Sequence, residues 1–405
     1  MTDRPIPITP EDVHWLGEPS QQRKLEQLSR DTRPLHQLLT ELRQQMGPDR
    51  ARLLVEQRAL RQRASAKFSA ANRMLLTSIG YQQATDEWIA KYKASRFERF
   101  GTVADLCCGI GGDTAALAQA AGHVVACDRD PGLLAMAEHN VGVQVPHEVA
   151  ARVEWHCGDV LQFPLAAVDA WHIDPDRRPA GHRSTRTAAH EPNDEVIDQF
   201  LAGHPYGAIK LAPASQPPAH WQAGGELEWI SRGGECRQLV VWHGGLTDSP
   251  GMRRATILPG ADSEPLASVV GQPTTASYDE SIEQYCYECD PALLAADLGG
   301  LLATELGLWA FAATYGYLTG TDRISHPLLK GYVVEEVLPL QIKRVTAVLR
   351  EREIGRLTIK HRGVRLDPEA LGKRLKPVGG RQGVLIVTRQ GERQIALICT
   401  RLVEP

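Results

Sequence analysis

From residue 101 the chain alternates short apolar runs with helical stretches, and this alternation restricts the fold more than any other feature. The apolar runs predict strands at 102–107, 123–127, 152–156, 168–173 and 206–211. Helices are expected between them, at 113–121, 131–140 and 194–201. This spacing predicts a parallel sheet covered by helices, which is an α/β fold. Three further runs, at 226–230, 236–242 and 254–258, lack long helices between them and are expected to close the sheet as antiparallel strands.

The rest of the chain differs in texture from this domain. The expected domains are a helical region at 1–100, the α/β domain at 101–260, a linker with a helical segment at 261–325 and a small α+β domain at 326–405. In the helical region, apolar residues recur three or four apart over 35–75 with one break at Gly47-Pro48, and another helix is expected at 85–97. The linker is expected to be a loop at 261–278 and helical at 291–317.

The last domain has its own pattern and a strong basic excess. Its expected strands are 332–337, 355–361, 383–388 and 394–400, and its expected helices are 340–352 and 368–375. The formal net charge of the chain is −4, but residues 1–100 carry +5, residues 101–340 carry −18 and residues 341–405 carry +9. Two basic ends predict contact with a polyanion such as RNA, and a solvated basic face is the alternative. The side chains expected to track phosphates are Lys343, Arg344, Lys360, Arg362, Arg365, Lys373, Arg374 and Lys376.

No feature of the sequence predicts export or a membrane span. The amino-terminal residues lack a basic start followed by an apolar run, and no apolar stretch is long enough to span a bilayer. The eight cysteines are scattered, several within apolar runs, so reduced thiols in the cytoplasm are expected. Cys286-x-x-Cys289 has no second pair or nearby histidine at zinc spacing, so no metal site is expected.

The segment Asp105-Leu-Cys-Cys-Gly-Ile-Gly-Gly-Asp113 lies between the first strand and its helix. A glycine-rich turn there lets a ligand approach the backbone at the amino end of the helix. A dinucleotide fingerprint fits poorly, because Thr114 replaces the third glycine and Asp113 would repel a pyrophosphate. S-adenosylmethionine fits better, since it carries an ammonium and a sulfonium. The residues expected to contact it are Asp105, Cys107, Gly109, Gly111, Gly112 and Asp113.

Acidic residues also follow the next strands. Asp128, with Arg129 beside it, ends the second strand and is expected to accept both ribose hydroxyls. Asp159 follows the third strand and is expected to hold the adenine amino group, while Val160 donates its backbone N–H. Each acid alone is equally consistent with a turn or a helix cap. Four polar strand ends in this order, the fourth being Asp174, predict a methyltransferase.

The fourth strand ends in Asp174-Pro175-Asp176-Arg177-Arg178, where the strand order is expected to reverse and ligands bind. Lys210 ends the fifth strand and is expected to border the same cleft.

On these motifs, residues 101–260 resemble class I S-adenosylmethionine-dependent methyltransferases, which have a Rossmann-like sheet. The glycine-rich turn is similar to that of trimethylguanosine synthase-like RNA cap guanine-N2 methyltransferases. The whole chain resembles bacterial proteins with a C-terminal THUMP-like domain, whose pattern includes residues 63–68 and 84–97. The resemblance implies S-adenosylmethionine as cofactor and, since THUMP domains bind RNA, an RNA substrate.

The fourth strand departs from the pattern of the amino-methylating relatives. Those proteins carry Asn or Asp, then Pro-Pro and an aromatic residue that stacks on the base. Here Asp174-Pro175 matches the first half and Asp176-Arg177 replaces the second. Stacking would then come from an arginine, Arg177 or Arg178, or from an aromatic ring elsewhere. The candidate rings are Trp171, His172, Tyr206 and Trp221.

The resemblance implies a role for each residue of this motif. Asp174 and the carbonyl of Pro175 would orient a target amine, and Asp176 would take the released proton. Arg177 or Arg178 would anchor a phosphate, and salt bridges to the two aspartates are the alternative. The amino-terminal helices would either close over the cleft or only pack on the sheet. The residues that bear on this choice are Lys67, Phe68, Thr85, Trp88 and Arg96.

Three functions remain open at this point. The first is methylation of a base in RNA, with a guanine exocyclic amine favoured. The second is methylation of a small molecule or protein, with the basic tail in a structural role. The third is RNA binding by a chain that keeps the fold and has lost the chemistry. The intact set of Asp105, Gly109, Asp128 and Asp159 argues against the third, while Asp176-Arg177 keeps it open.

Overall fold

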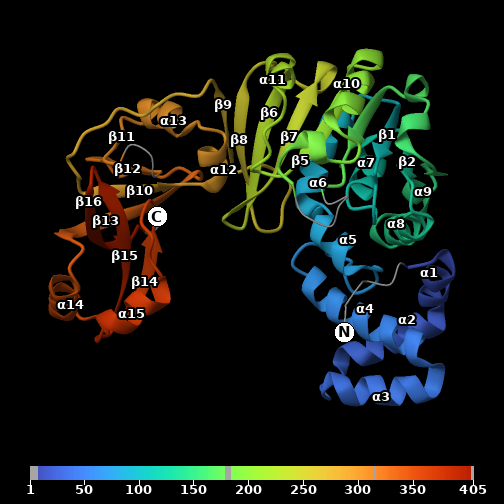
Figure 1. The fold of residues 1–405 in the computed structure, drawn as a ribbon, viewed down its shortest axis with the longest axis horizontal. Helices are drawn as coiled ribbons and strands as arrows, with labels where there is room; N and C mark the ends of the chain where they lie inside the picture. The colour runs from blue at the N-terminus through green and yellow to red at the C-terminus, as the bar shows by residue number, and fades with distance from the viewer. Residues whose placement is uncertain (1–7, 178–183, 313–315, 403–405) are drawn as a thin grey trace. The chain divides into compact units, whose positions relative to one another are not determined.

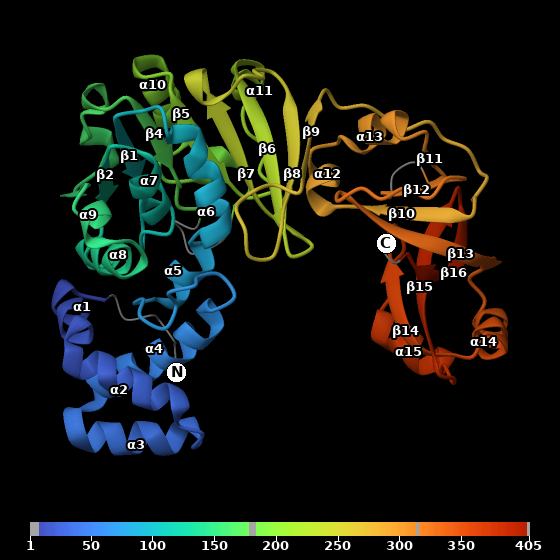
Figure 2. The same ribbon diagram turned by 180° about the vertical axis from the view of Figure 1, so that it is seen from behind.

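The computed structural model describes residues 8–177, 184–312 and 316–402. The chain forms two compact units, which Figures 1 and 2 show from opposite sides. The first unit comprises Met1–Glu226, Leu239–Gly251 and Ala261–Glu264. The second comprises Leu227–Gln238, Met252–Gly260 and Pro265–Pro405.

The first unit begins with a helical part. Its helices are α1 (Pro10–Gly17), α2 (Pro19–Arg30), α3 (Leu35–Met46), α4 (Pro48–Ala64), α5 (Ser78–Gln83) and α6 (Glu87–Ala94). Proline begins α1, α2 and α4, where its missing N–H is not needed and its fixed φ favours a helix. Gly47 has a φ of 84° and ends α3, so the expected break at Gly47-Pro48 is confirmed.

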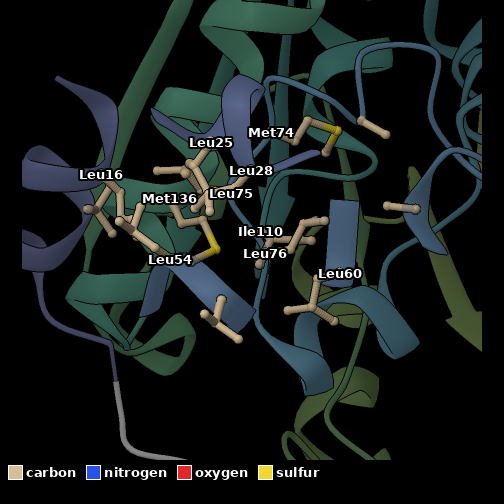
Figure 3. Packing of buried hydrophobic residues seen from close by; sticks show 14 of the residues in the cluster. Leu16, Leu25, Leu28, Leu54, Leu60, Met74, Leu75, Leu76, Ile110 and Met136 are labelled. Atoms are coloured by element: carbon tan, nitrogen blue, oxygen red, sulfur yellow. The ribbon is translucent and has the colours of Figure 1, made fainter. Parts of the chain in front are cut away.

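The apolar faces of these helices share one core with the α/β part of the unit. Figure 3 shows Leu16, Leu28 and Leu54 packed with Met136 of α8 (Pro131–Gln144) and Ile110 of the glycine-rich turn. Burial of such a side chain stabilises the fold by roughly 1.5–3 kcal/mol. The helical part is therefore joined to the turn by a continuous apolar core.

The parallel strands of the first unit lie in the order β3-β2-β1-β4-β5. They are β1 (Thr102–Leu106), β2 (His123–Asp128), β3 (Val153–Cys157), β4 (Ala170–Ile173) and β5 (Gly207–Leu211). The connecting helices are α7 (Thr114–Ala120), α8, α9 (His147–Ala150) and α10 (Asp194–Gly203). Because β1 lies between β2 and β4, the chain reverses its direction across the sheet there, and a crevice forms at the carboxyl ends of the strands.

Beyond β5, α11 (Ala219–Gly224) precedes the remaining strands of this sheet. These are β6 (Gly225–Arg232), β7 (Glu235–His243), β8 (Arg253–Leu258) and β9 (Ala267–Gly271). Strand β7 pairs antiparallel with β5, as expected. Strand β8 pairs parallel with β6, so the expected antiparallel direction is wrong there. The reason is that β8 does not pair with β7, the strand before it in the chain. It pairs with β6, which runs in the same direction as β8.

The second unit also contains a seven-stranded sheet with the order β11-β12-β10-β13-β16-β15-β14. Its strands are β10 (Tyr285–Cys289), β11 (Trp309–Ala310), β12 (Tyr317–Gly320), β13 (Leu329–Pro339), β14 (Ile354–His361), β15 (Arg381–Gln390) and β16 (Arg393–Arg401). Its helices are α12 (Pro291–Ala295), α13 (Gly299–Glu305), α14 (Ile342–Glu351) and α15 (Pro368–Leu375). Leu349 and Leu371 from the last two helices pack with Leu385 and Ile398 of the sheet.

The expected α/β fold class is confirmed, and so is the small α+β arrangement of the tail. The loop expected at 261–278 contains β9, and the single helical segment expected at 291–317 is divided into α12, α13 and β11. No helix in the described parts of the chain is long and apolar enough to cross a membrane. All eight cysteines are free thiols.

Candidate active site

A cleft of about 800 Å³ opens in the first unit at the carboxyl ends of β1 to β4. The residues expected from the sequence that line it are Asp105, Cys107, Gly109, Gly112, Asp113, Asp128, Arg129, Asp159, Val160, Asp174, Pro175, Asp176 and Arg177. Helices α4 and α5 and the segment 188–193 also contribute to the lining. Arg178 lies outside the described residues. The parallel sheet thus brings residues from four strand ends to one place.

The turn after β1 is built from left-handed residues. Cys107, Gly109 and Gly111 have φ angles of 57°, 55° and 79°. A Cβ atom on Gly109 would meet nothing within 4 Å, whereas one on Gly111 would lie 3.2 Å from Ala137 of α8. Gly109 therefore leaves space for a ligand, and Gly111 allows the turn to pack on a helix. The left-handed conformation of Cys107 costs roughly 1–2 kcal/mol.

The acids that follow β2 and β3 are held by backbone amides. The Asp128 carboxylate accepts hydrogen bonds from the N–H groups of Gly109 at 2.8 Å and Asp130 at 3.0 Å. Its burial raises its pKa. Asp159 accepts from the N–H of Leu161 at 3.0 Å. A carboxylate has about four lone-pair sites, so both acids keep capacity for ligand hydroxyl or amino groups. With the open space at Gly109, this arrangement fits the ribose and adenine of S-adenosylmethionine.

Arg129 is directed toward a protein partner. Its side chain is 62% exposed and forms an ion pair with Glu191. The backbone of Glu191 in turn pairs with that of Asp176, through N···O distances of 2.8 and 2.9 Å. This contact joins the end of β2 to the segments that follow β4.

The residues after β4 are held by the helical part and by β5. The Nζ atom of Lys210 lies 2.5 Å from Oδ2 of Asp174 and donates to the carbonyl of Gln83 at 3.0 Å. The side-chain amide of Gln83 donates to Oδ1 of Asp176 at 3.0 Å. Lys210 of β5 thus contacts Asp174, and Gln83 of α5 contacts Asp176, so the helical part and β5 both hold the end of β4.

The acids that flank the turn are turned toward buried partners. Asp105 accepts from Oγ1 of Thr114 at 2.5 Å and lies 2.8 Å from Nδ1 of His172. Asp113 lies 2.6 Å from Nζ of Lys93 and accepts from Oγ1 of Thr85 at 2.6 Å. Burial alone would raise the pKa of Asp113, but the ammonium groups of Lys93 and Lys210 hold it well below its usual value. Both acids therefore face internal partners as well as the cleft.

The expected stacking rings lie away from the cleft. Trp171 and Trp221 are fully buried in the core, and His172 is engaged with Asp105. Tyr206 precedes β5, at the opposite edge of the sheet, and packs against Phe100. Among the described lining residues no Phe, Tyr or Trp occurs, and the ring present is that of His190.

His190 has a restricted environment. Its Nε2 atom lies 3.1 Å from the carbonyl oxygen of Ser184, and burial lowers its pKa.

Five residues bear on whether the helical part closes over the cleft, and of these Thr85 lines the cleft. Lys67 donates to the carbonyls of Tyr81 and Ala84, and Phe68 is 1% exposed in the core. The ring of Trp88 lies beneath the ammonium group of Lys91 in the same helix. Arg96 forms an ion pair with Glu226 of β6 at 2.9 Å.

Sequence reasoning missed the roles of Gln83 and Lys93. Their partners Asp176 and His172 are 93 and 79 positions away in the chain, so no local pattern marks them.

In the second unit, two of the eight basic residues expected to track phosphates are already paired. Lys360 and Arg362 lie 2.7 and 3.5 Å from the buried Glu288. The six exposed ones are Lys343, Arg344, Arg365, Lys373, Arg374 and Lys376. Four of these belong to α14 and α15, which pack against each other.

Comparisons with known proteins agree with this geometry. Residues 103–174 match a methyltransferase domain model, and residues 329–401 match a THUMP domain-like model. Uncharacterised S-adenosylmethionine-dependent methyltransferases from two strains of Mycobacterium tuberculosis are each 31% identical over 370 residues, covering 88% of this chain and 98% of theirs. A crystal structure described as a methyltransferase of Porphyromonas gingivalis covers 98% of this chain and 100% of its own, with 20% identity and a TM-score of 0.77.

The relatives from M. tuberculosis correspond to nearly the whole chain, and the solved structure shares its fold. The cofactor is S-adenosylmethionine, and the tail is a THUMP-like domain. The protein belongs to the family of S-adenosylmethionine-dependent methyltransferases.

Proposed function

We propose that this methyltransferase acts on RNA and methylates an exocyclic amine of a base, with guanine favoured. One observation supports this most: Asp174 and Pro175 lie in the cleft with the cofactor residues, in a chain whose tail matches a THUMP-like domain. A carboxylate and a backbone carbonyl side by side are two acceptors, which suits the two N–H bonds of an amine. The exposed basic residues of α14 and α15 would contact phosphates.

Each cleft residue then has a defined task. Bound S-adenosylmethionine supplies the methyl group. Asp128, Asp159 and the N–H of Val160 hold the ribose and adenine, and the open side of Gly109 receives the ligand. Asp174, fixed by Lys210, accepts an N–H of the target amine together with the carbonyl of Pro175, which aims the nitrogen lone pair.

Asp176 takes the proton that the amine releases. Gln83 orients its carboxylate through the 3.0 Å contact with Oδ1. Arg177 lines the same cleft and would stack on the base or anchor a phosphate.

The charge of the cleft favours a second candidate, an amine on a small molecule or a protein. Besides the residues assigned to the cofactor and to the target amine, its described lining includes the acids Glu56, Asp130 and Glu191. The arginines of that lining are Arg129 and Arg177, and Arg129 is paired. An acidic cleft repels phosphates and attracts cationic amines. If the substrate is RNA, only the base would enter the cleft and the phosphates would remain outside it.

The test is transfer of label from isotopically labelled S-adenosylmethionine into extract of a strain that lacks this gene. RNA, protein and small-molecule fractions are assayed separately, with wild-type protein and Asp174→Ala. We expect label in an RNase-sensitive fraction, lost in Asp174→Ala while S-adenosylhomocysteine binding by calorimetry stays within about threefold. Label confined to another fraction would favour the second candidate. Cofactor binding without label in any fraction would contradict both.

A further inference from the structure

A closed ring of side chains lies beneath the glycine-rich turn. Thr114 donates to Oδ2 of Asp105 at 2.5 Å, and Nδ1 of His172 lies 2.8 Å from Oδ1 of the same carboxylate. Lys93 places its Nζ 3.2 Å from Nε2 of His172 and 2.6 Å from Oδ1 of Asp113. Asp113 and Thr114 are neighbours in the chain, so the ring closes through their peptide bond. It connects α6, β1, β4 and the start of α7.

The direction of each hydrogen bond in the ring is determined by chemistry. A lysine ammonium can only donate, so Nε2 of His172 must accept and carry no proton. The proton of the neutral ring is then on Nδ1, which donates to Asp105. The side chains of Lys93, Asp105 and His172 are at most 2% exposed, so water does not compete for these contacts. Asp105 and Lys93 therefore favour the same tautomer, in which Nδ1 donates to Asp105 and Nε2 accepts from Lys93.

The ring joins the two ends of the cofactor-binding turn. Asp105 stands just before the turn and Asp113 just after it, with the left-handed Cys107, Gly109 and Gly111 between them. Such backbone conformations persist where the surroundings over-determine them. A buried ion pair is by itself weak evidence for stability, because apolar side chains of similar size often stabilise a core as well. Because the ring joins the two ends of the turn, we infer that it fixes the backbone conformation of the turn.

We propose that Lys93 is a positioning residue for the cofactor. By closing the ring it holds the turn at 107–112 in the conformation that binds S-adenosylmethionine, without touching the ligand. Since Lys93 belongs to α6, the helical part is then a component of the cofactor site as well as a wall of the cleft. This role of Lys93 concerns cofactor binding alone and does not depend on which acceptor is methylated.

The test compares Lys93→Met with two controls in the full chain. Lys91→Met removes a partly exposed lysine of the same helix, whose partners Glu87 and Trp88 lie outside the ring. Leu38→Ala removes a buried side chain of α3 and lowers stability without touching the ring. The readout is S-adenosylhomocysteine affinity by calorimetry, at a temperature where every variant is folded. We expect Lys93→Met to bind roughly tenfold more weakly, the scale typical of groups that orient ligand-contacting residues, and both controls to stay within about twofold.

A spectroscopic readout tests the ring directly. In ¹⁵N spectra of histidine-labelled protein, Nε2 of His172 should be the unprotonated nitrogen in the wild type and in Lys91→Met. In Lys93→Met, Asp105 still holds the proton on Nδ1, but Nε2 loses its donor, so the ¹⁵N shift of Nε2 should move toward that of an imidazole nitrogen without a hydrogen bond. If Lys93→Met does not fold, Lys93→Met/Asp113→Asn removes the carboxylate that has lost its ion pair with Lys93; it should fold and should bind more weakly than Asp113→Asn alone. Affinity within twofold of the Leu38→Ala control, with the ¹⁵N shift of Nε2 unchanged, would overturn the proposal.

Discussion

Two glycines of the cofactor turn have left-handed backbones for different reasons. Gly109, with a φ of 55°, has open space where a Cβ would stand, whereas a Cβ on Gly111, with a φ of 79°, would lie 3.2 Å from the backbone of Ala137. Gly109→Ala should cost about 1 kcal/mol of folding free energy, the penalty of a left-handed L-residue, and should weaken cofactor binding because the methyl group occupies the ligand's side. Gly111→Ala should cost about 3 kcal/mol, since a helix must also shift.

Urea unfolding and S-adenosylhomocysteine calorimetry measure the two effects separately. Equal losses of stability in Gly109→Ala and Gly111→Ala would contradict this division of roles.

His243 should contribute to the dependence of stability on pH. His243 ends β7, and burial lowers its pKa from 6.5 to about 4. Between these values the unfolded chain binds a proton that the folded chain does not. The contribution of His243 to the free energy of unfolding is therefore fully present above pH 6.5 and is lost as the pH drops toward 4. The loss attributable to His243 is about 3 kcal/mol at most. Urea unfolding at pH 7.5 and 4.5 should show a smaller pH difference for His243→Gln than for the wild type; an equal difference would exclude His243 as the cause.

At the scale of elements, Asn140 of α8 joins the helical part to the turn. It is fully buried, accepts from the N–H of Leu75 at 2.7 Å, and donates to the carbonyls of Leu75 and Ile110 at 2.9 and 3.0 Å. Asn140→Ala leaves three buried backbone groups without this partner, which should cost about 3 kcal/mol. Glu138→Ala, at an exposed position of the same helix, should change stability by less than about 0.5 kcal/mol.

Chemical denaturation measures both variants. Because Ile110 belongs to the turn, Asn140→Ala should also weaken S-adenosylhomocysteine binding. Wild-type stability in Asn140→Ala would show that the three contacts do not join these elements.

Elements with a strong local pattern were predictable from the sequence. Helix α15 begins and ends where its pattern does, at Pro368–Leu375, and β1 differs by one residue. Strand β9 was missed because it is short and lies in a segment rich in Pro, Ser and Thr. Strand β10 (Tyr285–Cys289) was also missed, since its apolar character is weak and its pairing with β12 and β13 is non-local.

The candidate site divides in the same way. Strand order and strand ends are sufficient to place Asp128, Asp159 and Asp174 at one edge, because parallel strands align their carboxyl ends. The buried contacts of the site were not predictable, since Lys93 reaches His172 and Gln83 reaches Asp176 from helices distant in the chain. Two candidate stacking rings do not line the cleft, because Trp171 faces the core from its strand and Tyr206 precedes its strand.

At the scale of the whole molecule, the acidic cleft and the exposed basic helices belong to different units. In the first unit acids outnumber bases along the described lining of the cleft, whereas α14 and α15 of the second unit expose Lys343, Arg344, Lys373 and Arg374. A chain that binds RNA would therefore use the second unit for phosphate contacts and the first for the base. This division predicts that RNA affinity and cofactor affinity can be altered independently.

Reversal of four charges tests that independence. Replacement of Lys343, Arg344, Lys373 and Arg374 by Glu should weaken binding to a single-stranded RNA oligonucleotide and an RNA duplex. The slope of log affinity against log salt concentration should fall by about three, because each phosphate contact on a single strand contributes about 0.7. S-adenosylhomocysteine affinity should not change, since the cofactor cleft belongs to the first unit.

The comparison is a reversal of three exposed arginines in the helical part, Arg23, Arg30 and Arg43. These residues belong to the other basic end of the chain, and we expect their reversal to have the smaller effect because they are spread over α2 and α3. If this reversal abolished RNA binding while the four-residue reversal left it intact, the phosphate path would lie on the helical part. If neither reversal changed the salt slope, the basic ends would be solvated faces, and the acceptor would be sought among cationic amines that the acidic cleft attracts.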